Sequence, residues 1–156
     1  MASAVADPER IAIRRARPGD ASSVRALVRQ LGYEPQDRSF DETFAQVARH
    51  PESVVFMACR GVQLVGYLAM SHRPQIRLGG RVAYIDELVV DSSTRGHGIG
   101  GELLNQALVH AKGLGCVRVE VLCGTARDAY KRGFYAARGL TEIETAVYRL
   151  DLSGTR

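Results

Sequence analysis

The chain has 156 residues, 46% hydrophobic and 24% charged, which is typical of one globular domain that needs no metal or disulfide to fold. Its net charge of +4 is spread along the chain, and without tryptophan or a recognition motif we expect no nucleic-acid partner. The longest apolar run, residues 54–59, is far shorter than the roughly 20 residues of a membrane span, and the first ten residues lack a secretory-signal pattern. We therefore expect a cytoplasmic protein that does not bind membranes.

The first fifty residues predict one strand and two helices. Residues 11–14 alternate weakly, as in a strand, and lead into a turn at residues 17–20. Apolar residues then recur at helical spacing from Val24 to Leu31. A second helix is predicted for residues 39–49, with Ser39 as its N-cap.

The rest of the chain alternates strands with helices. Residues 53–60 and 64–71 predict a hairpin, and residues 81–90 predict a third β run. A helix from residue 99 to residue 111 has one clear apolar stripe. The remaining predicted elements are a strand at residues 116–123, a helix at 127–138 and a last strand at 145–152.

This order of elements indicates an α/β domain with a mixed sheet. We expect an N-terminal tail at residues 1–10, a single domain at 11–152 and a C-terminal tail at 153–156. The three cysteines, Cys59, Cys116 and Cys123, lie in apolar runs without a C-x-x-C pair or a histidine at ligand spacing. They predict free thiols packed in the core, and no metal site.

A glycine-rich segment, Arg95-Gly96-His97-Gly98-Ile99-Gly100-Gly101, lies directly between a predicted strand and a predicted helix. Glycines let the main chain approach a ligand closely, and the free amides and dipole at a helix start favour an anion. A phosphate group is therefore the expected ligand of this turn.

Two phosphate-binding motifs fit this segment less well. The nucleotide P-loop requires Lys and then Ser or Thr after its last glycine, but Gly101 is followed by Glu102. The dinucleotide fingerprint G-x-G-x-x-G is satisfied, with Glu120 nineteen positions beyond Gly101. Only about one further βα unit follows, however, whereas a dinucleotide-binding fold needs several more parallel strands. A glycine-rich turn without a ligand is the remaining alternative.

The segment resembles the R/Q-x-x-G-x-G/A signature of the GNAT superfamily of N-acetyltransferases, which binds the pyrophosphate of coenzyme A. Residues 88–91 before it resemble the superfamily's fourth strand, and residues 134–140 resemble its FY-x-x-x-G-F segment, with Leu140 in place of the aromatic residue. The resemblance implies a mixed central sheet of about six to seven strands, about four helices, and fourth and fifth strands that splay apart.

Acetyl-CoA is the cosubstrate that the resemblance implies, with no metal. Its pantetheine chain is expected to bind main-chain groups of the fourth strand, as an added strand would. Its pyrophosphate is expected on the amides of the glycine-rich turn, with Arg95 as a counter-ion. The expected cofactor-binding residues are Leu88, Val89, Val90, Arg95, Gly96, His97, Gly98, Ile99, Gly100 and Gly101.

The resemblance further implies direct transfer of the acetyl group to a primary amine of a small molecule or peptide in a ternary complex. Tyr135 is expected to protonate the departing thiolate. Glu87, Asp86 and Glu120 are candidates for the base, with Asp86 also a candidate for binding the substrate. Asp86 and Glu87 are adjacent in a strand, so we expect their side chains on opposite faces.

The acceptor amine is left open by the sequence. A carboxylate near the cleft suits a cationic amine, whether amino sugar, aminoglycoside, polyamine, amino acid or protein N-terminus. Tyr33 is a candidate acceptor contact, although helix packing explains it equally well. A homodimer is implied by the resemblance only, and a non-catalytic module that binds coenzyme A is the alternative function.

Overall fold

The computed structural model describes residues 10–152 of the chain. Contacts between residues divide the chain into two compact units, Met1–Leu122 and Cys123–Arg156. The expected single domain at residues 11–152 stays a prediction. The expected tails, residues 1–10 and 153–156, lie outside the described residues except for Arg10.

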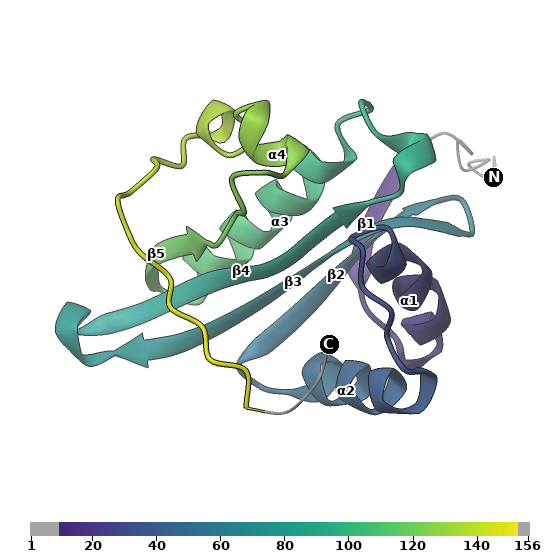
Figure 1. The fold of residues 1–156 in the computed structure, drawn as a ribbon, viewed down its shortest axis with the longest axis horizontal. Helices are drawn as coiled ribbons and strands as arrows, with labels where there is room; N and C mark the ends of the chain where they lie inside the picture. The colour runs from purple at the N-terminus through teal and green to yellow at the C-terminus, as the bar shows by residue number, and fades with distance from the viewer. Residues whose placement is uncertain (1–9, 153–156) are drawn as a thin grey trace, which may run out of the picture. The chain divides into compact units, whose positions relative to one another are not determined.

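The first unit contains a five-stranded mixed sheet in the order β1-β2-β3-β4-β5 (Figure 1). Neighbouring strands are antiparallel except for β4 and β5, which are parallel. The strands are β1 (Ile11–Arg15), β2 (Ser53–Arg60), β3 (Gln63–Gln75), β4 (Gly80–Val90) and β5 (Cys116–Val121). The predicted mixed α/β class is confirmed, but the expected six to seven strands are too many for the described part of the chain.

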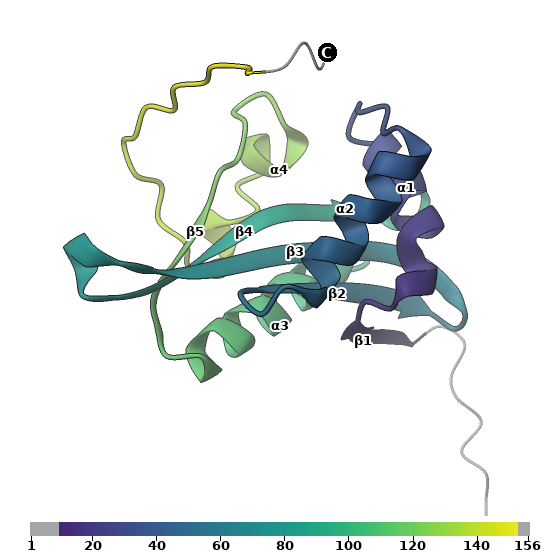
Figure 2. The same ribbon diagram turned by 90° about the horizontal axis from the view of Figure 1, so that it is seen from below.

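Helices cover both faces of this sheet (Figures 1 and 2). On one face, α1 (Ala21–Arg29) and α2 (Asp37–Arg49) bury side chains against Tyr67, Ala69 and Val89. On the other face, α3 (Ile99–Gly113) lies so close to β3 that a Cβ atom added at Gly66 would meet Ile99 and Leu103. Successive residues of a strand point to opposite faces, which is why Gly66 and Tyr67 contact different helices.

The bounds of α2 and β3 are among those that differ from the predicted ones. Helix α2 begins two residues before Ser39, and the Ser39 hydroxyl donates to the Gln36 carbonyl oxygen at 3.2 Å rather than capping the helix. Strand β3 continues to Gln75 because its last residues pair with the start of β4, with Gln75 opposite Gly80. A short turn at Ile76–Leu78 closes this long hairpin.

The second unit contains little regular structure in its described part, residues 123–152. Helix α4 (Asp128–Lys131) is followed by a single 3-10 turn at Ala136–Arg138. The predicted continuous helix at 127–138 is wrong because Gly133 adopts a φ of +62°, outside the helical region. The strand predicted at 145–152 is also wrong: Tyr148 and Leu150 are exposed, and alternation alone does not form a strand without a pairing partner. With α4 counted, residues 10–152 contain the expected four helices.

Candidate active site

The glycine-rich segment forms a tight turn between β4 and α3. Gly96 and Gly98 have φ values of +82° and +80°, which residues with a side chain rarely adopt. The first amide to enter the helical pattern is that of Glu102, which donates to Gly98 at 3.0 Å. The amides of residues 95–101 donate to none of the residues that the structure describes. The turn therefore offers a series of unbonded N–H groups at a helix N-terminus, which suits an anion.

The loop that leads into this turn is held by Asp91 and Gln30. The Asp91 carboxylate accepts hydrogen bonds from the Ser93 amide at 2.9 Å and from Gln30 Nε2 at 3.0 Å. Gln30 in turn accepts from the Ser92 amide at 2.9 Å. Hydrogen bonds from the Ser93 and Gln30 side chains lower the pKa of Asp91. These hydrogen bonds connect the end of α1 to the loop that precedes the turn. The sequence did not predict this contact.

One edge of β4 is open beside the turn. Pairing between β4 and β5 ends at Ile85 and Val121, and no described strand pairs with β4 beyond that point on this side. The Asp91 amide donates to the Val65 carbonyl, so Asp91 and Val89 direct their main-chain groups toward β3. The alternate residues Leu88 and Val90 therefore direct theirs to the open side. These open positions fit the expected splay of the two strands.

Arg95 lies at the end of this open edge. Its Nε donates to the Val90 carbonyl oxygen at 3.1 Å, which holds the exposed guanidinium beside the turn. His97, by contrast, directs Nδ1 to the carbonyl oxygens of Thr94 and Arg95 at 3.1 and 3.0 Å. The histidine thus stabilises the turn, while the arginine supplies a positive charge next to the unbonded amides.

A β-bulge in β4 places two carboxylates on the same face of the sheet. Glu87 lies opposite Ala69, but Met70 lies opposite Ile85, so Asp86 is an extra residue in β4. Tyr67 donates its hydroxyl hydrogen to Glu87 Oε2 at 2.5 Å, and Ser71 donates to Asp86 Oδ1 at 3.1 Å. Tyr67 and Ser71 share one face of β3. The expectation that Asp86 and Glu87 point to opposite faces is therefore wrong, because the bulge interrupts the alternation.

These contacts change the titration of two groups. Burial raises the pKa of Asp86, and the nearby negative charge of Glu87 raises it further, while the hydrogen bond from Ser71 opposes both effects. Burial and the neighbouring Glu87 carboxylate also raise the pKa of Tyr67 above its ordinary range. Tyr67 therefore remains a neutral phenol that donates to Glu87.

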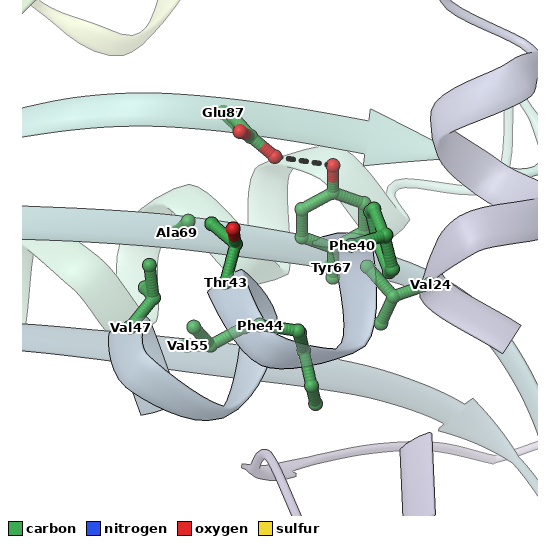
Figure 3. A pocket seen from close by; sticks show the side chains of 9 residues that line it. All are labelled: Val24, Phe40, Thr43, Phe44, Val47, Val55, Tyr67, Ala69 and Glu87. Carbon is green, nitrogen blue, oxygen red and sulfur yellow. Dashed lines mark hydrogen bonds between the residues drawn. The ribbon is translucent and has the colours of Figure 1, made fainter. Parts of the chain in front are cut away.

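A pocket opens over this face of the sheet, between α2 and strands β2 to β4 (Figure 3). It holds about 410 Å³, including the open solvent at its mouth. The hydrogen-bonded pair of Tyr67 and Glu87 lies at one side, and apolar side chains form most of the remaining wall. Its lining consists of Val24, Phe40, Thr43, Phe44, Val47, Val55, Tyr67, Ala69 and Glu87.

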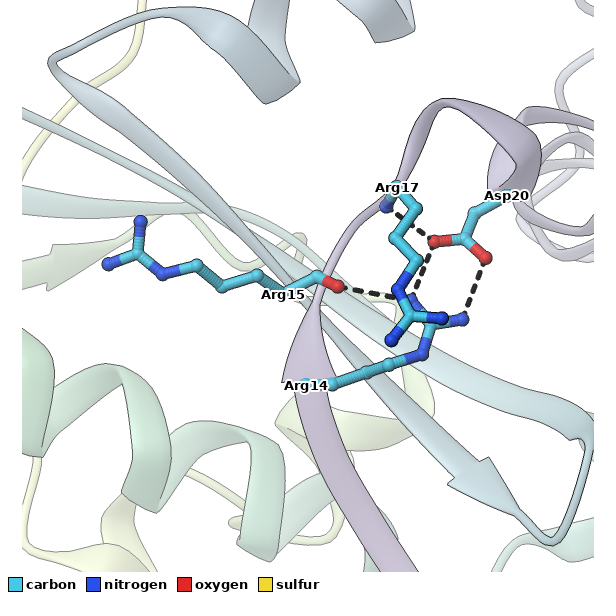
Figure 4. A network of polar contacts seen from close by, with 4 residues as sticks. All are labelled: Arg14, Arg15, Arg17 and Asp20. Atoms are coloured by element: carbon cyan, nitrogen blue, oxygen red, sulfur yellow. Dashed lines mark hydrogen bonds and ion pairs between the residues drawn. The ribbon is translucent and has the colours of Figure 1, made fainter.

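The start of α1, which carries Val24, is fixed by the ion pair of Arg14 and Asp20 (Figure 4). Both terminal nitrogens of Arg14 donate to the carboxylate at 2.8 Å, and the Arg17 amide donates at 2.7 Å. The Arg14 hydrogen bonds are the main reason that the pKa of Asp20 is lowered. This nearly buried carboxylate therefore anchors the helix that contributes Val24 to the pocket.

The other predicted site residues lie elsewhere. Glu120 is beside Tyr84 in the register of β4 and β5 and pairs with Arg118 at 3.3 Å. Tyr33 is exposed in the connection between α1 and α2 and does not line this pocket. Their roles stay predictions.

Tyr135 belongs to the second unit. Its ring meets Phe134 edge to face, with the ring centroids 5.0 Å apart. Burial is the main reason that its pKa is raised to about 12, and the Cys123 thiol raises it further against the opposing charge of Arg127. The phenol is therefore protonated at neutral pH.

Tyr67 is the site residue that sequence reasoning missed. Its position in an apolar strand predicts a core residue, and its side chain is indeed buried. Only the pairing of β3 with β4 brings its hydroxyl to Glu87.

Neither a metal centre nor a membrane span is found within residues 10–152. These residues contain no group of three or more His, Cys, Asp or Glu side chains arranged to hold a metal ion. None of their helices has the length and apolar character needed to cross a bilayer. Among the cysteines, Cys59 is buried, while Cys116 and Cys123 are partly exposed.

A known family matches this arrangement of turn, strand and carboxylate. The sequence model of the acetyltransferase (GNAT) family matches residues 22–140, which includes the pocket, the open edge and the turn. The chain belongs to the GNAT acetyltransferase family. The predicted resemblance is thereby confirmed, and the characteristic cosubstrate of a GNAT enzyme is acetyl-CoA.

Individual GNAT relatives agree with this assignment. Glucosamine 6-phosphate N-acetyltransferase 1 of Oryza sativa subsp. japonica is 33% identical over 103 residues, which are 66% of this chain and 60% of that protein. The chain thus matches less than two thirds of the length of this relative. An acetyltransferase structure from Trypanosoma brucei has a TM-score of 0.77 and 26% identity, covering 92% of this chain and all of that one.

The same fold occurs in a structure described as a transcriptional regulator from Bacillus halodurans C-125. Its TM-score is 0.83 at 22% identity, and the alignment covers 91% of this chain and all of that one. At this identity, the likeness concerns the GNAT fold alone.

Proposed function

We propose that this chain transfers the acetyl group of acetyl-CoA directly to a primary amine of a small molecule or peptide. The observation that carries the proposal is the Glu87 carboxylate on β4, because the same strand continues into an open edge and a turn of unbonded amides. One strand thus carries a candidate base and leads to a candidate site for the acetyl donor.

The residues that hold acetyl-CoA in this proposal are those of the open edge and the turn. Main-chain groups of Leu88 and Val90 bind the pantetheine chain, and the amides of residues 95–101 bind the pyrophosphate with Arg95 as a counter-ion. Acetyl-CoA supplies the thioester. The Val90 amide, on the open side, polarises the thioester carbonyl.

The acceptor must lose a proton before it can attack, because an alkylammonium ion has no free electron pair. Glu87 takes this proton directly or through a water molecule, and Tyr67 positions the carboxylate through the hydrogen bond at 2.5 Å. The nitrogen then bonds to the acetyl carbon and the carbon–sulfur bond breaks. The thiolate takes the hydroxyl proton of Tyr135, which we assign as the acid on its sequence motif and its raised pKa of about 12. The nitrogen loses its second proton as the amide forms, and this proton restores the Tyr135 hydroxyl through water. Asp86 and Glu120 remain the alternative bases.

The test of this function is release of the coenzyme A thiol from acetyl-CoA in the presence of a broad panel of amines. Glu87→Gln is expected to lower kcat by about 10²- to 10⁴-fold, the usual contribution of a general base. Glu144→Gln, the same change at an exposed position of the second unit, is the matched control and is expected to leave kcat unchanged.

Two outcomes separate the proposal from its alternatives. Full activity of the Glu87→Gln variant overturns the assignment of the base in favour of Asp86 or Glu120. A rise in melting temperature with acetyl-CoA, without thiol release for any amine, identifies a non-catalytic module that binds coenzyme A. Glucosamine 6-phosphate belongs in the panel because the rice relative is named for it. The homodimer stays a prediction, to be checked by sedimentation.

A further inference from the structure

The pocket beside Glu87 has an unusual chemical composition for a site that receives a polar metabolite. Of its nine lining residues, only Glu87 carries a charge, and no lining residue is Arg, Lys or His. The phenol of Tyr67 is already engaged with Glu87, which leaves the Thr43 hydroxyl as the remaining polar side chain. The rest of the wall is aliphatic or aromatic.

A cation that contacts the lining residue Phe40 is also engaged. Arg25 lies over the Phe40 ring, with its guanidinium carbon 5.6 Å from the ring centroid, and pairs with Asp41 at 2.5 Å. Binding a phosphate requires Arg, Lys or unbonded amides that face the ligand. Because the Arg25 charge is neutralised by Asp41, the lining offers nothing that favours a phosphorylated acceptor.

We infer that the acceptor is a small primary amine whose carbon skeleton is apolar, not a phosphorylated amino sugar. This inference rests on the proposed function and names the substrate class of the same site. The ammonium group is attracted to the Glu87 carboxylate, and the neighbouring carbons lie against Phe44, Val47 and Val55. A sugar placed there would lose hydrogen bonds from its hydroxyl groups to water without regaining them from the wall.

The first experiment compares kcat/KM of the full chain for apolar and polar primary amines. The apolar probes are 2-phenylethylamine and 3-methylbutylamine, and the polar probes are 1,4-diaminobutane and glucosamine 6-phosphate. 1,4-Diaminobutane has the same number of non-hydrogen atoms as 3-methylbutylamine but adds a second charge. We expect the apolar probes to exceed the polar ones by at least about tenfold, since each buried methylene group is worth about 0.8 kcal/mol, or roughly fourfold, and each apolar probe buries two or more.

Two lining variants test whether the preference arises in this pocket. Val47→Thr keeps the side-chain shape but adds a hydroxyl, so we expect a KM for 2-phenylethylamine about fourfold higher, the effect of roughly one methylene group. Thr43→Val makes the opposite change and is expected to lower this KM. The KM for acetyl-CoA is expected to stay constant in both. Val109→Thr, the same exchange at an exposed site on α3, is the matched control and is expected to change neither constant.

The possible outcomes distinguish this inference from the function on which it rests. A higher kcat/KM for glucosamine 6-phosphate or 1,4-diaminobutane than for both apolar amines overturns the inference and leaves the acetyltransferase proposal intact. Preference for the apolar amines with no response to either lining variant also overturns it, because the selectivity then arises elsewhere. Absence of thiol release with every amine overturns the proposed function and the inference together.

Discussion

Tyr67→Phe is the substitution that most directly tests the pair of Tyr67 and Glu87. The change removes one oxygen atom, keeps the buried ring in the core and abolishes the O–H donor that lies 2.5 Å from Glu87 Oε2. Hydrogen bonds to charged groups are worth about 1.5–3 kcal/mol. Because Glu87 is exposed and water replaces part of the lost donor, we take the lower end of that range, which corresponds to a roughly tenfold loss in kcat.

A double-mutant cycle measures whether Tyr67 acts through Glu87. Thiol release is followed for the wild type, Tyr67→Phe, Glu87→Gln and the double variant, with kcat and both KM values determined for each. We expect Tyr67→Phe to lower kcat in the wild type but to have almost no further effect in Glu87→Gln, with KM for acetyl-CoA unchanged throughout. Additive effects of the two substitutions would refute the positioning role, and an unchanged kcat in Tyr67→Phe would refute it directly.

Two further predictions concern the supports of the site. Asp20→Asn is expected to lower the free energy of unfolding at pH 7 by about 2 kcal/mol, because Arg14 loses a charged acceptor, and to lower Tm by about 4–8 °C. The folded-state pKa of Asp20 is lowered, so its contribution is complete above the ordinary pKa near 4 and is lost as the pH falls further. Unfolding curves at pH 7 and pH 3 check this, and a difference between wild type and variant that is equal at both pH values would contradict it. Gln30→Ala removes two hydrogen bonds to the loop before the turn and is expected to raise KM for acetyl-CoA about tenfold with little change in kcat. Gln46→Ala, at an exposed position of α2, is its control, and equal KM values for the two variants would show that the loop does not depend on Gln30.

Features that depend on neighbouring residues in the chain could be predicted from the sequence. The turn at residues 95–101 is one of them, since glycines between an apolar strand and an amphipathic helix can adopt the positive φ values that a tight turn requires. Helix α3 was predictable for the same reason, because its apolar stripe is uninterrupted from Ile99 to Ala111.

Features that depend on pairing between distant segments could not be predicted in this way. The position of Asp86 is the clearest case, because an inserted residue is invisible until β4 is aligned against β3. Residues 145–152 are the opposite case. Their apolar residues alternate as in a strand, but they form no strand because no described strand pairs with them. Tyr67 shows both effects, because a residue that looks like ordinary core acquires a chemical role only from the strand beside it.

In a regular strand, the alternation that places side chains in the core also places adjacent residues on opposite faces. The bulge in β4 allows the acids to share one face while the residues around them stay in the core. On either side of the two acids, Ile85 and Val89 are buried in the hydrophobic interior, so the sheet remains packed. At the bulge itself, neighbouring acids share one side, and each has its own hydroxyl donor. Such a scaffold permits exchange of one acid for another, or adjustment of their spacing, without repacking the protein around them. The acid at the bulge can therefore change while the fold is retained.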